Sequence, residues 1–231
     1  MATPQITILA AGMGTRLGRP FPKPLTQLKD GRSILQQQLD NVREVFGPEV
    51  KIQIVVGFKL DLIMEAAPSA VFVYNENYDQ TNTNKSLLKA LRASHEGPVL
   101  WMNGDVVFDP AILTRLREHI DQGKTVIAVN TSAVSDEEVK YTVNADGSVK
   151  ELSKTVVGGL GEAVGINAVS AADKAALIAR LDECAEQDYF ERGIELAIEK
   201  DGLKVIPIDI SDLFAVEIDF EADLERANER P

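Results

Sequence analysis

A glycine-rich stretch near the N-terminus is followed, within a few residues, by an arginine and a lysine. The stretch 9–18 reads LAAGMGTRLG and overlaps an apolar run, 6–11, that is typical of a buried strand. Glycines after a strand let the backbone approach a phosphate chain, and free N–H groups there bind its oxygens. Arg16 offers a planar fork of donors for phosphate, and Lys23, between two prolines, offers a compact charge. This order of residue types predicts a site that holds positive charge over a triphosphate as pyrophosphate leaves.

The glycine pattern differs from two well-known phosphate-binding motifs. A dinucleotide-binding fingerprint requires glycine where Leu17 stands, and a P-loop requires Gly-Lys followed by Ser or Thr, which this sequence lacks. For the glycines alone, a plain strand-to-helix turn is the alternative, and for Lys23 it is a solvated loop lysine. Arg16 and Lys23 together favour phosphate binding.

Two aspartates follow predicted strands and could bind a metal ion. Asp105 follows an apolar run, 98–102, in the sequence Asn-Gly-Asp, and Asp219 ends the sequence Val-Glu-Ile-Asp. Acids at the carboxyl ends of strands face the same rim of a sheet as the glycine-rich stretch. Because Mg²⁺ prefers oxygen ligands and needs only one or two carboxylates besides substrate phosphates, Asp105 and Asp219 are the predicted ligands. Asp109 and Glu217 are rival ligands, and helix capping is the alternative role for Asp109 and Asp219.

An amide-rich segment, 74–87, precedes a predicted helix. It reads YNENYDQTNTNKSL, and such side chains both donate and accept hydrogen bonds, as recognition of a base or ribose requires. Asn82, Thr83 and Ser86 are the candidates here. Asn82 and Thr83 are equally good helix-capping residues, so part of the segment could serve the helix start alone.

The chemistry-bearing residues require a scaffold of alternating strands and helices. In the first half, strands are expected at 6–11, 52–56, 70–74, 98–102 and 125–130, and helices at 34–45, 61–66, 84–94 and 111–121. Such alternation predicts an α/β fold, a Rossmann-like, mostly parallel, twisted sheet with helices on both faces. In the second half, strands are expected at 141–143, 149–152, 163–169, 205–208 and 213–218, and helices at 172–184, 189–199 and 220–228. We expect a single domain over 1–231, with a small β-rich segment near 136–170 inserted over the sheet.

Composition limits the possible partners and location. A formal net charge of -12 argues against broad binding to nucleic acid or to an anionic membrane. The single cysteine, Cys184, excludes an internal disulfide framework and a cysteine-based zinc site. The N-terminal residues lack a basic region before their short apolar run, and no segment approaches the length of a membrane span, so a cytoplasmic protein is expected. The sequence does not indicate an oligomeric state.

The stretch LAAGMGTRLG followed by PKPL resembles the signature of the nucleotide-sugar pyrophosphorylase superfamily, which runs roughly G-x-G-T-R-L and then P-K-P. The resemblance implies a GT-A-like nucleotidyltransferase fold in which Arg16 and Lys23 are catalytic cations on the phosphates of an NTP. It also implies that Asp105 and Asp219 jointly hold Mg²⁺. With the amide-rich segment included, the expected nucleotide-binding residues are Leu9, Ala10, Ala11, Gly12, Met13, Gly14, Thr15, Arg16, Lys23, Asn82, Thr83, Ser86, Asn103 and Gly104.

Within that superfamily, the run N-x-x-Y-x-x-x-N-x-x-x-S-L at 75–87 resembles the branch of choline-phosphate cytidylyltransferases and relatives acting on phosphonates. This resemblance implies CTP as the nucleotide, although UTP, dTTP or GTP stay open. The superfamily's Gly-Glu motif and nearby lysine imply that Glu162 and Lys154 contact the acceptor, a small phosphomonoester or phosphonate. A predicted helix opens with Tyr189, Phe190, Glu191 and Arg192, which could also reach the acceptor. Few aromatic residues in this half disfavour phosphocholine, because a quaternary ammonium prefers an aromatic cage.

The expected reaction is direct in-line attack of an acceptor oxygen on the α-phosphorus. Such an oxygen is already anionic at neutral pH, so no general base is required. One alternative is a sugar-1-phosphate nucleotidyltransferase that uses UTP, dTTP or GTP, and another is a catalytically silent nucleotide-binding domain. A glycosyltransferase of related fold would require an Asp-x-Asp motif, which the sequence 104–107 lacks.

Overall fold

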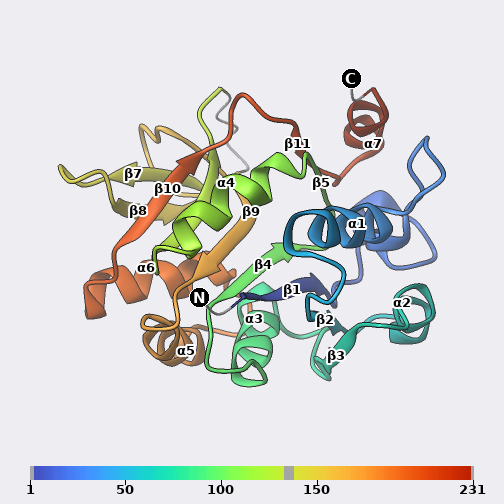
Figure 1. Cartoon of the computed structure of the whole chain (residues 1–231), viewed down its shortest axis with the longest axis horizontal. Coiled ribbons are helices and arrows are strands. Elements are labelled where there is room, and N and C mark those ends of the chain that lie inside the picture. Colours follow the sequence, from blue (N-terminus) through green and yellow to red (C-terminus); the bar gives the residue numbers. More distant parts are fainter. Residues whose placement is uncertain (1–2, 133–137, 230–231) are drawn as a thin grey trace.

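A computed structural model describes residues 3–132 and 138–229 of the chain, and its central element is β1 (Gln5–Ala10). β1 pairs in parallel with β2 (Ile52–Val56) and with β4 (Val99–Asn103), and β3 (Val71–Tyr74) pairs in parallel with β2. The three inner strands point their carboxyl ends to the same edge of the sheet (Figure 1). The parallel arrangement predicted for the first half is therefore confirmed.

The second half adds strands to the other side of β4. The order of the main sheet is β10-β6-β9-β4-β1-β2-β3, in which β6 (Thr125–Asn130) and β10 (Val205–Asp209) are parallel to each other. β9 (Gly161–Val169) runs antiparallel between β4 and β6. The prediction that the segment near 136–170 lies over the sheet is therefore wrong for β9, which is a central strand. Its end is buried from Gly165 to Val169 because the sheet is covered on both faces.

A hairpin branches from the main sheet. β7 (Lys140–Val143) pairs with β8 (Val149–Ser153) and, at its start, with β9. The hairpin turn at 144–147 is confirmed, because Gly147 has a φ of 82° and its N–H donates to the carbonyl of Asn144. Residues 136 and 137 of the predicted β-rich segment lie outside the described residues.

Helices cover both faces of the sheet, as predicted. α1 (Ile34–Phe46), α2 (Leu60–Ala66) and α4 (Ala111–Ile120) pack on one face, together with Ile6 and Ile8 of β1. α3 (Thr83–Arg92), α5 (Lys174–Glu183) and α6 (Phe190–Asp201) pack on the other face, with Leu9 of the same strand. Alternate residues of a strand point to opposite faces, so the apolar run of β1 supplies both cores. Within the described ranges, no helix combines the length and the apolar character needed to cross a membrane.

A second, two-stranded sheet links the end of the chain to the main sheet. β5 (Val106–Phe108), which the sequence did not predict, pairs antiparallel with β11 (Ala215–Glu217), which is shorter than predicted. The pairing continues where the N–H of Ile218 donates to the carbonyl of Asp105, at 3.0 Å. α7 (Glu221–Asn228) follows and packs beside it. This small sheet brings the late residues 217–219 next to the end of β4.

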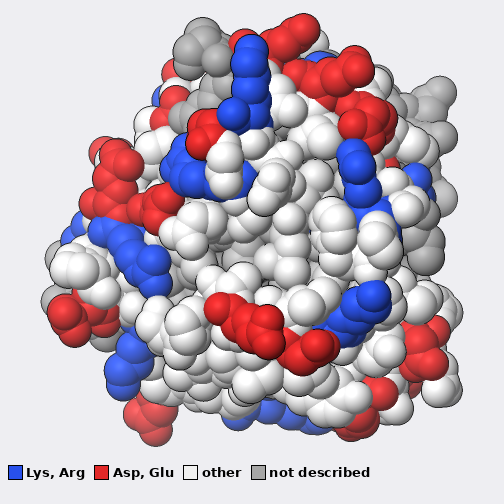
Figure 2. Space-filling model, turned by 90° about the vertical axis from the view of Figure 1, so that its right-hand side faces the viewer, with Lys and Arg blue, Asp and Glu red and all other residues white. Residues whose placement is uncertain are grey.

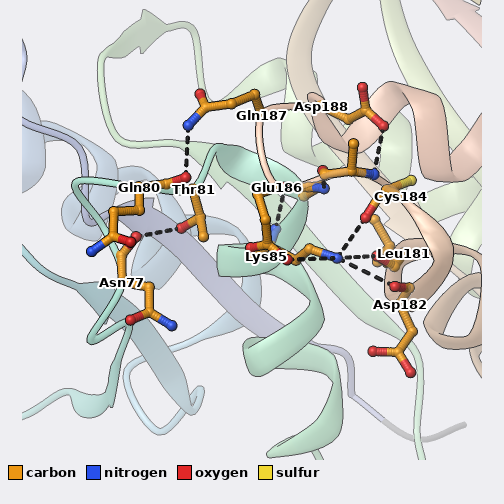
Figure 3. A network of polar contacts seen from close by, with 12 residues as sticks. Asn77, Gln80, Thr81, Lys85, Leu181, Asp182, Cys184, Glu186, Gln187 and Asp188 are labelled. Atoms are coloured by element: carbon orange, nitrogen blue, oxygen red, sulfur yellow. Dashed lines mark hydrogen bonds and ion pairs between the residues drawn. The ribbon is translucent and has the colours of Figure 1, made fainter.

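A partly buried lysine joins the start of α3 to the carboxyl end of α5. The ammonium of Lys85 donates to the carbonyl oxygens of Leu181, Asp182 and Cys184, the last at 2.7 Å (Figure 3). These carbonyls lie at the carboxyl end of α5, where helical N–H partners run out and a cation is stabilised by the helix dipole. The contact fixes the segment that leads into α6.

Lys85→Met should therefore lower the free energy of unfolding by about 2 kcal/mol, because partly buried hydrogen bonds from a charged group are lost. Urea unfolding would measure the change. Lys89→Met is the matched control, since Lys89 lies on the same helix but pairs with Glu76 in a more exposed contact. An equal loss of stability in both variants would contradict the assigned role of Lys85.

Candidate active site

The glycine loop and Lys23 pack against each other at the carboxyl end of β1. Lys23 lies in a short 3₁₀ turn, Lys23–Leu25, and only 9% of the residue is exposed. Gly14 has a φ of 59°, and a Cβ at this position would lie 3.0 Å from the Cβ of Lys23. A side chain at Gly14 would therefore strain the backbone and crowd the lysine, so glycine is required where the loop passes Lys23.

Lys23 lies between two carboxylates. Its Nζ is 2.8 Å from Oδ2 of Asp105 and 2.7 Å from Oδ1 of Asp219. Burial alone would lower the pKa of Lys23, but the two acids outweigh it and raise that pKa to about 12. Arg16, half exposed, donates from Nη1 to Oδ2 of Asp219 at 2.6 Å. Burial would raise the pKa of Asp219, yet its contacts with Lys23 and Arg16 hold that pKa below its ordinary value.

A third carboxylate joins these two. Asp105, Glu217 and Asp219 each place one carboxylate oxygen within 4.8 Å of the others. Oδ1 of Asp105 is buried and has no hydrogen-bond partner among the described atoms. Burial, and then the charge of Asp105, raise the pKa of Glu217 well above its ordinary value. Three converging oxygen donors with one orphaned oxygen fit a hard divalent cation such as Mg²⁺. From the sequence, Glu217 was an alternative metal ligand to Asp105 and Asp219. The structure places its carboxylate together with those of both predicted ligands.

The capping alternatives are resolved by the hydrogen bonds. Asp109 accepts from the N–H of Ala111 at 2.9 Å, so it caps the start of α4, and the cluster of three acids does not include it. Asp223 accepts from the N–H groups of Asp219 and Phe220 at 3.0 and 2.8 Å. Asp223 therefore caps α7, while the side chain of Asp219 binds Lys23 and Arg16.

A cavity of about 250 Å³ lies between the glycine loop and the start of α6. The predicted residues that line it are Leu9, Ala10, Gly12, Gly14, Lys23, Thr83, Asn103, Gly104, Asp105, Lys154 and Tyr189. A neighbouring cavity of about 430 Å³ is lined by Asp219 and Glu162, and Glu217 and Glu138 line both. The face of the molecule on the right of Figure 1 is hollowed near its centre, with basic and acidic side chains around the hollow (Figure 2).

Other predicted nucleotide-binding residues lie outside the cavity lining. Ala11 is buried, Met13 and Arg16 are exposed beside the loop, and the side chain of Thr15 lies outside the described part of the structure. Asn82 accepts from the N–H of Thr83 and donates to the carbonyl of Gln187. Ser86 is buried and accepts from Asn75 at 3.1 Å. The polar side chains of Asn82 and Ser86 therefore have partners within the protein, and their contact with nucleotide stays a prediction.

The predicted acceptor residues separate into two groups. Nζ of Lys154 lies 4.8 Å from the ring centroid of Tyr189, and both line the 250 Å³ cavity. Glu162 faces only the neighbouring cavity. Glu138 lines the first cavity but was not among the predicted sites. Glu191, which was expected with Tyr189 to reach the acceptor, lines the same cavity. It lies three residues before Ile194, in the apolar stripe of the helix.

The mostly parallel sheet with helices on both faces is the GT-A-like fold of nucleotidyltransferases. The cluster of cations and acids lies at the carboxyl end of its central strand. The chain belongs to the family described as the MobA-like NTP transferase domain, which matches residues 6–191. It is therefore a nucleotidyltransferase.

Curated relatives and solved structures point the same way. Over 119 residues, 47% of this chain, it is 39% identical to a CMP-5'-(3-aminopropyl)phosphonate synthase of Streptomyces rubellomurinus. Over 149 residues, 62% of this chain, it is 33% identical to a bifunctional protein GlmU of Cyanothece sp.. The matches span 18% and 32% of those relatives. The fold is similar to that of a CTP:phosphocholine cytidylyltransferase from Streptococcus pneumoniae, with a TM-score of 0.76, 18% identity and 99% of both chains covered.

Proposed function

We propose that this nucleotidyltransferase is a Mg²⁺-dependent cytidylyltransferase that transfers CMP from CTP to a small phosphomonoester or phosphonate and releases pyrophosphate. The supporting observation is the position of Lys23, between Asp105 and Asp219 on the wall of the cavity that the glycine loop also lines. Phosphate transfer depends on positioning and on charge held against the moving phosphate oxygens. This arrangement brings both together.

Asp105, Glu217 and Asp219 would hold the Mg²⁺ ion. Their oxygens converge within 4.8 Å, and the buried Oδ1 of Asp105 has no hydrogen-bond partner among the described atoms. When bound, the ion would supply positive charge that polarises phosphate oxygens. Lys23 pairs with two of these acids, so we infer that its ammonium turns to the triphosphate when nucleotide binds, and Arg16 likewise.

The chemical step is an in-line displacement. An oxygen of the acceptor phosphate or phosphonate forms a bond to the α-phosphorus of CTP, the bond to the bridging oxygen breaks, and that oxygen leaves with its electron pair in pyrophosphate. The attacking oxygen is anionic at neutral pH, so no side chain needs to remove a proton. Lys23 and Arg16 stabilise the charge that collects on the leaving group.

The choice of CTP is supported by the names of two similar proteins, a CMP-aminopropylphosphonate synthase and a CTP:phosphocholine cytidylyltransferase. The similarity to the GlmU proteins favours a second candidate, a sugar-1-phosphate nucleotidyltransferase that uses another NTP. Cytosine and uracil present opposite donor and acceptor patterns, so a site that hydrogen-bonds one base edge discriminates against the other.

We expect CTP to give at least about tenfold higher kcat/KM than UTP, dTTP, GTP or ATP, the size of effect that an unpaired hydrogen bond produces. Pyrophosphate release would be measured with each NTP over a panel of phosphonates, phosphomonoesters and sugar 1-phosphates. Reactions without acceptor are the control. Faster turnover with UTP or dTTP and a sugar 1-phosphate would contradict the cytidylyltransferase and support the sugar-1-phosphate nucleotidyltransferase.

A further inference from the structure

Glu191 is a buried carboxylate at the acceptor end of the cavity. It lies in the first turn of α6, is 8% exposed, and lines the 250 Å³ cavity. Its Oε2 atom is buried and has no hydrogen-bond partner in the described parts of the chain. Leaving a buried carboxylate oxygen unpaired costs free energy, so its presence on a cavity wall points to a ligand group that completes it.

The position of Glu191 is fixed by its neighbours. Phe190, the adjacent residue, packs its ring edge-to-face against Trp101 at a centroid distance of 5.7 Å. The N–H of Phe190 donates to Oγ1 of Thr83, which ties the start of α6 to α3. The loop before α6 is held in turn by Lys85 (Figure 3). Glu191 is therefore held at the cavity by well-packed elements.

The charges around Glu191 favour a cationic ligand group. Glu138, half-buried, also lines the cavity, and its negative charge acts on Glu191. The 40% exposed ring of Tyr189 lies at the same end, and an aromatic face attracts a cation. Lys154 lies over that ring, where its charge acts on Glu191, yet Oε2 stays without a hydrogen bond. Burial raises the pKa of Glu191 to about 7, and a bound cation would stabilise its ionised form.

We propose that Glu191 determines acceptor specificity by binding an ammonium group, so that the acceptors are small phosphonates or phosphomonoesters that carry an amine. This inference rests on the proposed function and adds the substrate class. The anionic end of the acceptor lies toward Lys23, where the reacting oxygen meets the nucleotide, and the ammonium lies against Glu191. A sugar phosphate, which carries no ammonium group, would leave Oε2 of Glu191 without a partner.

Matched acceptors test the inference. In 2-aminoethylphosphonate and propylphosphonate, an ammonium group is exchanged for a methyl group of similar size. With CTP and Mg²⁺, the full-length protein should favour the amine by about 100-fold in kcat/KM, because a site built to pair a polar group rejects the analogue that lacks it. Glu191→Gln should reduce turnover of the amine at least tenfold and leave propylphosphonate within about twofold of wild type. Glu199→Gln, an exposed change on the same helix, should alter neither.

Two further measurements separate specificity from folding and from catalysis. Glu191→Gln should raise the Tm or leave it unchanged, because the substitution removes an unpaired buried charge. Calorimetric titration of the protein with 2-aminoethylphosphonate in the absence of CTP should show weaker binding in Glu191→Gln. Equal use of both phosphonates by the wild type, or a preference for sugar 1-phosphates, would overturn the inference while nucleotidyl transfer stands. Absence of pyrophosphate release with every acceptor and NTP would overturn the proposed function and the inference with it.

Discussion

Lys23→Met should lower kcat/KM for the nucleotide by about a thousandfold or more, which is at the upper end of the effect of removing one transition-state donor. The methionine side chain has similar length and fits the same buried turn, but it carries no charge toward the triphosphate. The wild-type side chain of Lys23 is 10% exposed, so water has little access to the position that its ammonium occupies. Pyrophosphate release at saturating Mg²⁺ would measure the loss. Lys150→Met, at an exposed position of β8, is the control and should keep wild-type turnover.

A second readout shows whether that loss is catalytic or structural. Without Lys23, the carboxylates of Asp105, Glu217 and Asp219 repel one another, so the Tm of Lys23→Met should fall when Mg²⁺ is absent. The same carboxylates are then free of their ammonium competitor, so added Mg²⁺ should raise the Tm of the variant more than that of wild type. Turnover within tenfold of wild type would contradict the role of Lys23, and so would a Tm that does not respond to Mg²⁺ in this variant.

The fold was predictable where strands are long and apolar, and the site was predictable where motifs follow strands. β1, β2 and β4 are continuous apolar runs, and the rule that strand ends share one edge placed Asp105 beside Lys23 correctly. The antiparallel direction of β9 was not predictable, because a strand buried on both faces reads as the same apolar run in either direction. β5 has only three residues, too few for a periodic pattern.

The acids of the cavity show what single motifs miss. Glu217 ends β11 and Asp219 follows it by two residues, so their nearness in the sequence alone could have grouped them. Among the residues expected at the start of α6, the helical period distinguishes Glu191, because it is an acid in an apolar stripe. For Asn82 and Ser86 no local pattern reveals the hydrogen bonds that their side chains make with Gln187 and Asn75, and their contact with nucleotide stays a prediction.

Asp105→Asn tests the metal site, and we expect it to lower kcat by about 100-fold or more, since a lost metal ligand removes charge from the transition state. The amide keeps the size of the side chain, and Lys23 keeps its 2.7 Å contact with Asp219, so the fold should persist. The half-saturating Mg²⁺ concentration should rise at least tenfold, because a neutral amide is a weaker ligand than a carboxylate.

Asp109→Asn is the matched control for Asp105→Asn. It makes the same chemical change four residues later, and asparagine also accepts the capping bond from the N–H of Ala111, so turnover and Mg²⁺ response should stay at wild-type values. Thermal shift with Mg²⁺ alone gives a readout that needs no substrate: the wild type and Asp109→Asn should gain Tm, and Asp105→Asn should gain much less. If all three proteins respond to Mg²⁺ alike, Asp105 is not a metal ligand and its contact with Lys23 serves the fold alone.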